Sequence, residues 1–204
     1  MAVNPLRHLR RSPQRATKYY MKWKVLNSKE LIKLGFFRLR DDMCELPDGR
    51  VMPHYYVIEF ADWVNVLPIT GGGEVIAVEQ FRHGSDLVHL EIPGGGMDPR
   101  KNEEPQAAGA RELIEETGYA SDNWIYCGYH YPNPALQNNR MHTFIALDCK
   151  KVAEQELDPF EDLTVKTFPV SELVEKLDSG VFTHSLIAAS VALAVPRLRK
   201  LKII

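Results

Sequence analysis

Three glutamates lie close together in the segment ARELIEETGY, residues 110–119. The i, i+3, i+4 spacing places Glu112, Glu115 and Glu116 on one face of a predicted helix. Carboxylates crowded in this way repel one another, and a divalent cation relieves the repulsion, since hard oxygen ligands suit Mg²⁺ or Mn²⁺. The alternative is a solvated acidic helix face. Arg111 before the cluster, Gly118 at the end of the helix and a Pro-Gly-Gly-Gly loop upstream favour a metal site.

The glutamate helix is predicted to follow a series of strands. It spans roughly residues 104–117, with Ala107, Ala108, Leu113 and Ile114 on its buried face. Upstream, a Pro-Asp-Gly turn indicates a hairpin, which follows a helix-like or turn segment around residues 28–33. Strands are expected at residues 62–69, 74–81, 87–92, 124–131, 141–147 and 163–170, and residues 94–96 are expected to form a loop.

The C-terminal part of the chain is predicted to be helical. Ser171 is a candidate N-cap for a helix that ends at Gly180. The final helix, residues 186–200, is apolar, and its basic last turn complements the helix dipole. A strand-rich core with two or three helices and no βαβ repeat indicates the α+β class.

The composition is that of an ordinary globular chain of 204 residues, 45% hydrophobic and 25% charged. The first 16 residues contain no apolar run, and the longest apolar stretch, residues 186–196, is too short to span a bilayer. Three cysteines outside any CxxC pattern argue against a disulfide framework or a zinc site. We therefore expect a cytoplasmic protein with no membrane partner.

The net charge of −2 conceals a basic N-terminus. Residues 1–24 carry seven Lys or Arg and no acidic residue, and residues 1–17 are expected to form a basic arm. Such an arm could contact RNA, a membrane surface or an acidic partner, but it is more often a loose solvated segment. RNA contact is therefore not favoured.

The glutamate segment resembles the signature of the Nudix hydrolases, G-x5-E-x7-R-E-U-x-E-E-x-G-U, in which U is a bulky apolar residue. Residues 111–119, RELIEETGY, match its second half, and Glu103 takes the place of its first glutamate. The position six residues before Glu103 is Met97 rather than glycine. A two-residue insertion in RKNEE would let Gly95 serve as that glycine, so the loop is lengthened relative to the family.

The similarity continues outside the signature, in GFFRLRDDMCELPDGRV, in VIAVEQFRHGSDLVHLEIPGG and at Pro134. These segments resemble the ADP-ribose pyrophosphatase and nucleoside-diphosphate-sugar hydrolase branch of the family. The resemblance implies a Nudix α/β/α sandwich at residues 61–204. It also implies a small N-terminal antiparallel β domain at residues 18–60, which in this branch commonly swaps across a homodimer.

The resemblance implies Mg²⁺-dependent hydrolysis of a pyrophosphate bond, with Mn²⁺ as an alternative ion. Glu112, Glu116 and Glu115 are the expected metal ligands, with Glu115 also a candidate catalytic residue. The backbone carbonyl of Gly94 would complete the coordination, and Glu91 in EIPGG matches a family glutamate near the metal. Arg111 is expected to hold the glutamate array, and Glu103 to orient the loop.

The general base is expected in the acidic loop EQELDPFEDL, where Glu161 matches best and Glu156 and Asp158 are rivals. Arg82 in QFRH would contact phosphate or the terminal ribose. Base stacking would fall to Phe37, with Phe36 or the Tyr55–Tyr56 pair as alternatives. Asn139 and Arg140, in the segment NPALQNNR, could bind sugar hydroxyls together with Asn133, Gln137 and Asn138.

The expected substrate is a nucleotide sugar: ADP-ribose, or a GDP- or UDP-hexose. A second hypothesis keeps the Nudix chemistry but places it on capped RNA or a dinucleoside polyphosphate. A third, a non-catalytic nucleotide-sugar sensor, is less favoured because the chain keeps every signature glutamate.

Overall fold

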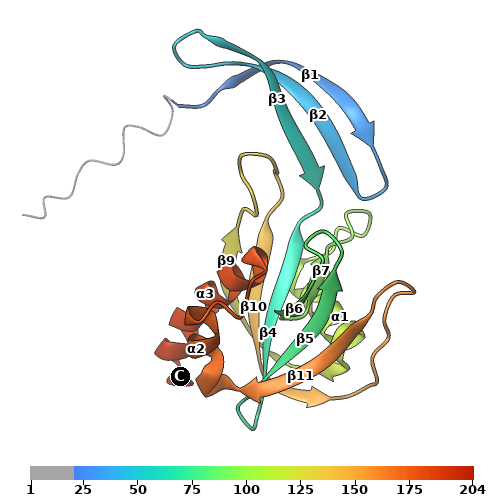
Figure 1. The fold of residues 1–204 in the computed structure, drawn as a ribbon, viewed down its shortest axis with the longest axis vertical. Helices are drawn as coiled ribbons and strands as arrows, with labels where there is room; N and C mark the ends of the chain where they lie inside the picture. The colour runs from blue at the N-terminus through green and yellow to red at the C-terminus, as the bar shows by residue number, and fades with distance from the viewer. Residues whose placement is uncertain (1–20) are drawn as a thin grey trace, which may run out of the picture.

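A computed structural model describes residues 21–204, which form a three-stranded sheet and an eight-stranded sheet with helices on both faces (Figure 1). The basic arm predicted for residues 1–17 lies outside the described residues. None of the described helices is long and apolar enough to cross a membrane. The mixed architecture agrees with the predicted α+β class.

The small sheet is antiparallel in the order β1-β2-β3, with β1 at Lys24–Lys33, β2 at Phe37–Glu45 and β3 at Val51–Phe60. The predicted Pro-Asp-Gly turn is confirmed, with Gly49 at φ 85° between β2 and β3. The prediction of a helix-like or turn segment at residues 28–33 is wrong. These residues pair along β2, with Ser28 opposite Asp42, because backbone pairing with a neighbouring strand overrides local propensity.

The large sheet has the strand order β11-β5-β4-β10-β8, and β6, β7 and β9 pair with β5, β4 and β10. Only β4 and β10 run parallel within it. Its strands are β4 Trp63–Thr70, β5 Glu74–Arg82, β6 Leu87–Glu91, β7 Gly94–Gly96, β8 Tyr119–Ala120, β9 Asn123–His130, β10 Met141–Lys151 and β11 Leu163–Pro169. The loop predicted at residues 94–96 is therefore a short strand, because its backbone pairs with residues 63–65 of β4.

Helix α1, Pro105–Thr117, covers one face of the large sheet, and α2, Leu173–Asp178, and α3, Ser185–Lys200, cover the other. Strand β4 shows the two faces: Val64 and Val66 pack with α1, whereas Leu67 and Ile69 pack with α3. Since both faces are covered, β4 is a nearly continuous buried run.

Two details of the helices differ from the predictions. Ser171 lies inside a 3-10 turn, Val170–Glu172, that leads directly into α2, so it does not cap that helix. On α1, Ala108 and Leu113 are buried as expected, but Ala107 and Ile114 are exposed. The buried face of α1 includes Glu112 and Glu116 in their place.

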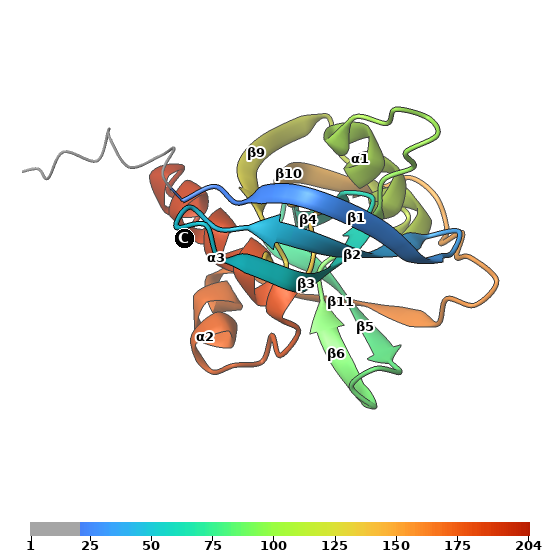
Figure 2. The same cartoon turned by 90° about the horizontal axis from the view of Figure 1, so that it is seen from above.

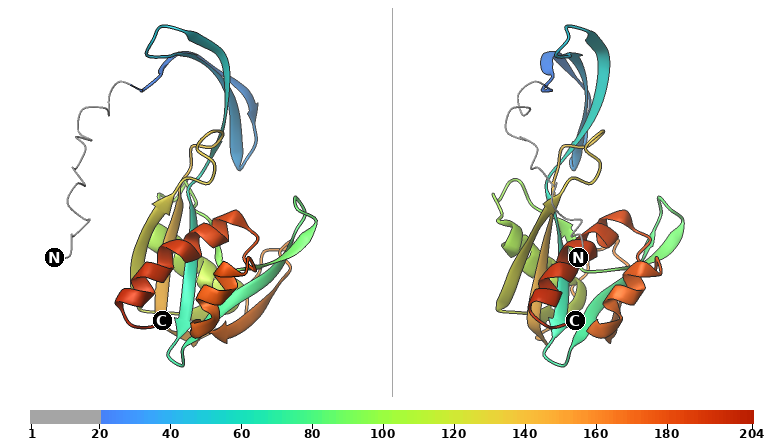
Figure 3. Two further views of the ribbon diagram at one scale, coloured as in Figure 1. Left: turned by 60° about the vertical axis from the view of Figure 1, so that its left-hand side comes forward. Right: turned by 90° about the vertical axis from the view of Figure 1, so that its left-hand side faces the viewer.

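The small sheet projects from one end of the sandwich, where β3 runs into β4 (Figures 1 and 3), and from above its strands lie over β4 and β10 (Figure 2). It is tied to the loop between β9 and β10: the Ile58 amide donates to the Leu136 carbonyl at 2.8 Å, and the Tyr55 hydroxyl donates to the Ala135 carbonyl at 2.9 Å. These contacts hold the small sheet at the end of the large sheet where β4 begins.

Candidate active site

Helix α1 carries Glu112 and Glu116 on its buried side, one turn apart, with Glu115 half-buried beside them. Pro105 begins the helix, where its missing amide proton costs nothing. Gly118 ends it at φ 72°, a left-handed conformation that glycine adopts without a Cβ clash. Both ends of the helix are therefore fixed by sequence, and the three carboxylates gather along one side.

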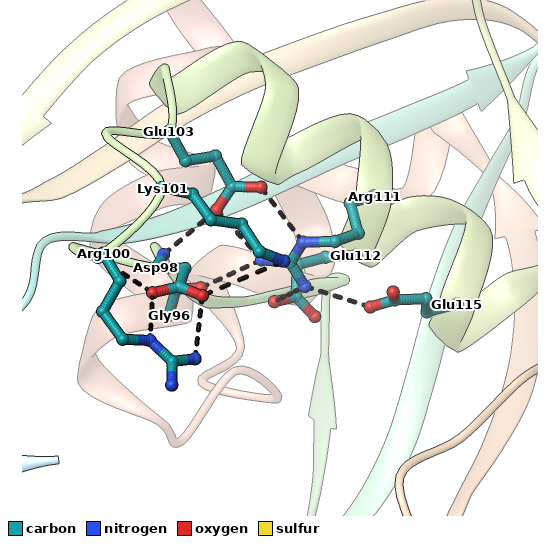
Figure 4. A network of polar contacts seen from close by, with 8 residues as sticks. All are labelled: Gly96, Asp98, Arg100, Lys101, Glu103, Arg111, Glu112 and Glu115. Carbon is teal, nitrogen blue, oxygen red and sulfur yellow. Dashed lines mark hydrogen bonds and ion pairs between the residues drawn. The ribbon is translucent and has the colours of Figure 1, made fainter. Parts of the chain in front are cut away.

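Arg111 holds this array together from within the same helix (Figure 4). Its Nη1 group donates to Glu112 Oε1 at 2.8 Å and to Glu115 Oε2 at 3.0 Å. Its Nε donates to Glu103 Oε1 at 3.1 Å, and Nη2 reaches the Gly96 carbonyl. Arg111 thus links the helix, the loop before it and strand β7, which is the organising role expected for it.

Strand β7 lies directly against the two buried glutamates. The Gly94 amide donates to Glu116 Oε2 at 3.1 Å. A Cβ at Gly95 would overlap the Glu112 carboxylate, and one at Gly94 would overlap the Val64 carbonyl and the Asn65 side chain. Close approach therefore requires glycine at position 94, where a Cβ would overlap backbone, whereas at position 95 a Cβ would displace the end of the Glu112 side chain.

Burial and mutual repulsion perturb the two inner carboxylates. Burial, followed by the charge of Glu112, raises the pKa of Glu116 to about 8. The pKa of Glu112 is also raised, chiefly by burial, although Arg111 opposes the shift. Glu161 adds to the repulsion on both. A carboxyl group with a pKa as far from its ordinary value as that of Glu116 is a candidate functional group, because such shifts cluster at active sites.

Arg82 and Glu91 form a second charged centre next to the glutamate helix. Arg82 Nε donates to Glu91 Oε1 at 2.9 Å and Nη2 donates to Oε2 at 2.7 Å, a bidentate pair. His184 Nδ1 lies 3.2 Å from Glu91 Oε1. Burial alone would raise the pKa of Glu91, but Arg82 and His184 lower it to about 2. Glu91 is therefore ionised, and in this structure its partners are Arg82 and His184.

The acidic loop after β10 returns to the C-terminal end of α1. The Glu156 amide donates to the Glu115 carbonyl at 2.8 Å, and Gln155 Nε2 donates to the Glu116 carbonyl at 2.7 Å. These bonds bring Glu161 to the same side of the molecule as Glu112 and Glu116. Glu161 itself accepts the Asp158 amide at 3.0 Å, which fixes its carboxylate at the turn.

A cavity of about 1090 Å³ lies between α1 and the acidic loop. Glu112, Glu115 and all three candidate bases line it, and Phe36 and Phe60 lie at the small-sheet end. We call it the glutamate cavity; besides the residues just named it is lined by Gly35, Ala61, Trp63, Gly95, Gly96, Met97, Asp98, Pro99, Arg100, Lys101 and Arg111.

None of the four predicted substrate-binding residues, Arg82, Phe37, Asn139 and Arg140, lines the glutamate cavity. Phe37 packs against Phe60, with ring centroids 5.8 Å apart, and Phe36 reaches the cavity in its place. Arg140 is bound to Asp62, and Asn139 is 2% exposed beside it. The structure thus separates the segment 133–140 from the glutamates within one chain.

Sequence reasoning did not identify His184, Thr183 or His89. His89 Nδ1 lies 2.7 Å from Thr183 Oγ1, and the His89 and His184 rings are 6.0 Å apart. The signal that could have found them is the Thr-His-Ser run immediately before the apolar final helix. Only the fold shows that this run meets β6, nearly a hundred residues earlier in the chain.

Comparison with known protein families identifies two regions of the chain. The N-terminal domain of nucleoside diphosphate sugar hydrolases matches residues 23–58, and the NUDIX domain matches residues 60–188. The chain belongs to the Nudix family. This Nudix protein therefore combines the family's hydrolase domain with the N-terminal domain of nucleoside diphosphate sugar hydrolases.

Individual relatives agree with this assignment. The Nudix protein is 31% identical to an ADP-ribose pyrophosphatase of Bacillus subtilis over 66% of its own length and 72% of the relative's. It is also 31% identical to an ADP-sugar pyrophosphatase of Mus musculus, over 64% of each chain. The solved structure of an ADP compounds hydrolase superposes with a TM-score of 0.78 at 20% identity, covering 92% of this chain and all of that one. The predicted Nudix α/β/α fold with its small N-terminal sheet is confirmed.

Nudix hydrolases generally use divalent metal ions. The donor chemistry here suits such an ion, since Glu116 is buried, its charge is disfavoured, and the Gly94 amide is the one hydrogen-bond partner of its carboxylate among the described residues. Within residues 21–204, however, no three acidic, His or Cys side chains already form a ligand cluster. Arg111 binds one carboxylate oxygen of Glu112 and one of Glu115, and the second oxygen of each is the atom that would ligate a cation.

Proposed function

We propose that this Nudix hydrolase cleaves the pyrophosphate bond of nucleoside diphosphate sugars, including ADP-ribose and ADP-, GDP- or UDP-linked hexoses. The products are a nucleoside monophosphate and a sugar phosphate. The observation that carries the proposal is the convergence of Glu112 and Glu116 with the glycine strand and Arg82. The N-terminal domain match and the two pyrophosphatase relatives support the same substrate class.

Glu112, Glu116 and Glu115 would hold Mg²⁺, or Mn²⁺ in its place, with the Gly94 carbonyl and Glu91 as further ligands. Bound there, the ion would neutralise phosphate charge and lower the pKa of a water molecule. The raised pKa values of Glu112 and Glu116 support this assignment for these two residues, because a cation favours the ionised form that burial disfavours.

Arg82 would position the pyrophosphate. It binds Glu91 through Nε and Nη2, so its Nη1 group is the part of the guanidinium that would meet a phosphate oxygen. The Glu91 bond fixes the plane of the guanidinium before substrate arrives. Lysine would not reproduce this geometry, because its ammonium group lacks the planar arrangement of donors that the guanidinium has.

Glu161 would act as the general base on the attacking water. It lines the glutamate cavity opposite α1, and its charge acts on both Glu112 and Glu116. Glu156 and Asp158 line the same cavity and remain rivals, and Glu115 is a further catalytic candidate. The base must sit within hydrogen-bond reach of the water that it deprotonates.

A homodimer would complete the molecule, with residues 18–60 as the small domain and residues 61–204 as the hydrolase domain. Strand β1 is exposed along its whole length and carries Val25, Leu26, Leu31 and Ile32 at 41–54% exposure. An exposed apolar edge strand of this length favours covering by another chain. In such a dimer Asn139, Arg140 or Phe37 could serve the partner's site.

The three free, buried cysteines favour a cytoplasmic location.

The proposal is tested with a substrate panel assayed with Mg²⁺, with Mn²⁺ and with EDTA. The panel contains ADP-ribose, ADP-glucose, GDP-mannose, UDP-glucose, a dinucleoside polyphosphate and capped RNA. We expect the highest kcat/KM on a nucleotide sugar and loss of activity in EDTA. Preference for capped RNA or the dinucleoside polyphosphate, or turnover that persists in EDTA, would refute the proposal.

A further inference from the structure

A second cavity, of about 570 Å³, lies on the α3 side of strand β7. It shares Trp63, Gly95 and Gly96 with the glutamate cavity, so the two cavities meet at the glycine strand. We call it the β6–α3 cavity, because β6 and the start of α3 form its other walls. A ligand whose pyrophosphate lies at β7 would therefore extend one end into each cavity.

The polar wall of the β6–α3 cavity is a chain of hydrogen bonds centred on His89, which is 7% exposed. Ser85 Oγ lies 2.6 Å from His89 Nε2, and Thr183 Oγ1 lies 2.7 Å from Nδ1. Ser85 Oγ donates its proton to the Arg82 carbonyl at 3.1 Å, so it accepts from His89, and Thr183 then donates to His89. Both hydroxyl oxygens keep lone pairs, which suits a ligand that brings O–H donors.

The rest of the wall combines aliphatic surface and an ion pair with the polar residues Asn65, His184 and Ser185. Ile92, Met141, Leu186 and Ile187 provide aliphatic surface. The Arg82 and Glu91 side chains, which also line the cavity, neutralise each other through their bidentate pair. The β6–α3 cavity therefore suits an uncharged ligand with apolar C–H surface and several hydroxyl groups, which describes a sugar ring.

The two cavities differ in aromatic content. Phe36, which is 72% exposed, and Phe60 line the glutamate cavity, whereas Trp63 is the one Phe, Tyr or Trp side chain among the described residues that line the β6–α3 cavity. A nucleobase gains most from flat aromatic partners. The base therefore fits the glutamate cavity and the sugar fits the other.

We propose that the β6–α3 cavity binds the sugar of the nucleotide sugar as an uncharged polyhydroxyl ring, with Ser85 and Thr183 accepting from its hydroxyls. This assignment rests on the proposed function. It also gives the direction of the substrate across β7.

The test fills the cavity and compares substrates with and without a sugar. Leu186→Trp, at the half-buried first turn of α3, adds an indole to the cavity wall. Val181→Trp adds the same ring at an exposed position outside both cavities and serves as the control. Each protein is assayed on ADP-glucose, ADP-ribose and the β-methyl ester of ADP, which keeps the base and pyrophosphate but has no sugar.

We expect Leu186→Trp to lower the ratio of kcat/KM for ADP-glucose to that for the methyl ester by about tenfold or more, mainly through KM, with no such change in Val181→Trp. Equal fold losses on both substrates would place a part common to both, such as the base, in this cavity, and no loss on either substrate would leave the sugar elsewhere; each result overturns the assignment. If Leu186→Trp does not fold, Thr183→Val provides the same ratio test. Failure of the wild type to cleave any nucleotide sugar would refute the proposed function itself.

Discussion

Gly95 lies against the carboxylate of Glu112 so closely that a methyl group on Gly95 would occupy the space of both carboxylate oxygens. The neighbouring Gly96 has no such constraint, since a Cβ there would meet only Trp63, at 4.0 Å. Two adjacent glycines of β7 thus have different roles. The first sets the position of a predicted metal ligand, and the second does not.

Gly95→Ala is expected to displace the Glu112 side chain and lower kcat/KM severely with little loss of stability, because the displaced group is the end of a flexible side chain. Gly96→Ala is the matched control and should keep near-normal turnover and stability. Steady-state kinetics and urea unfolding measure the two effects. Equal activity in the two variants would contradict the role assigned to Gly95.

Glu112→Gln and Glu116→Gln are each expected to lower kcat by about 10²-fold or more, because an uncharged amide is a poor ligand for a divalent ion and stabilises charge less well. Circular dichroism should show an intact fold. Glu154→Gln, at a side chain that is 95% exposed, changes the same charge without touching the site. Wild-type rates in either α1 variant at saturating Mg²⁺ would remove these residues from the metal site.

Glu161→Gln is expected to lower kcat much more than KM if Glu161 is the general base, because the substrate still binds but its water is not deprotonated. Glu156→Gln and Asp158→Asn, in the same loop and the same cavity, are the comparisons. A larger kcat loss in either of these would transfer the role to that residue. A change in KM alone for Glu161→Gln would make it a binding residue.

The metal-free protein is expected to lose stability as the pH rises from about 5 to about 8. Glu116 has a folded pKa of about 8 against an ordinary 4.5, so in this range the folded state holds a proton that the unfolded state has released. The free energy of unfolding should fall by about 1.4 kcal/mol per pH unit from this group. Glu112 contributes with the same sign. Glu91 acts oppositely, and only below pH 4.5, where its stabilising contribution is lost as the pH falls toward 2.

Urea unfolding in EDTA at several pH values measures this slope. Glu116→Gln has no such proton and should flatten it. Mg²⁺ should stabilise the wild type more at pH 8 than at pH 6, because the ion binds the deprotonated carboxylate. A slope that is unchanged in Glu116→Gln would assign the pH dependence to other groups.

The local order of the chain was predictable because it rests on short-range chemistry. The glutamate spacing, the glycine that ends α1 and the hairpin turn each act within a few residues, and the structure agrees with all three. Residues 28–33 were predicted wrongly for the complementary reason. These residues form a strand because they pair with β2, and the sequence of one segment does not indicate which strand will lie beside it.

The sequence by itself determined the helix that presents Glu112, Glu115 and Glu116, the family and the chemistry that carboxylates at this spacing favour. The tertiary structure decided which groups share the site. It placed Arg82 on Glu91, His184 beside them, Glu161 opposite α1 and Phe36 rather than Phe37 at the cavity. The physical reason is distance along the chain: helical periodicity is a property of neighbouring residues, whereas these contacts join strands and loops that meet only when the sheet closes its hydrophobic core.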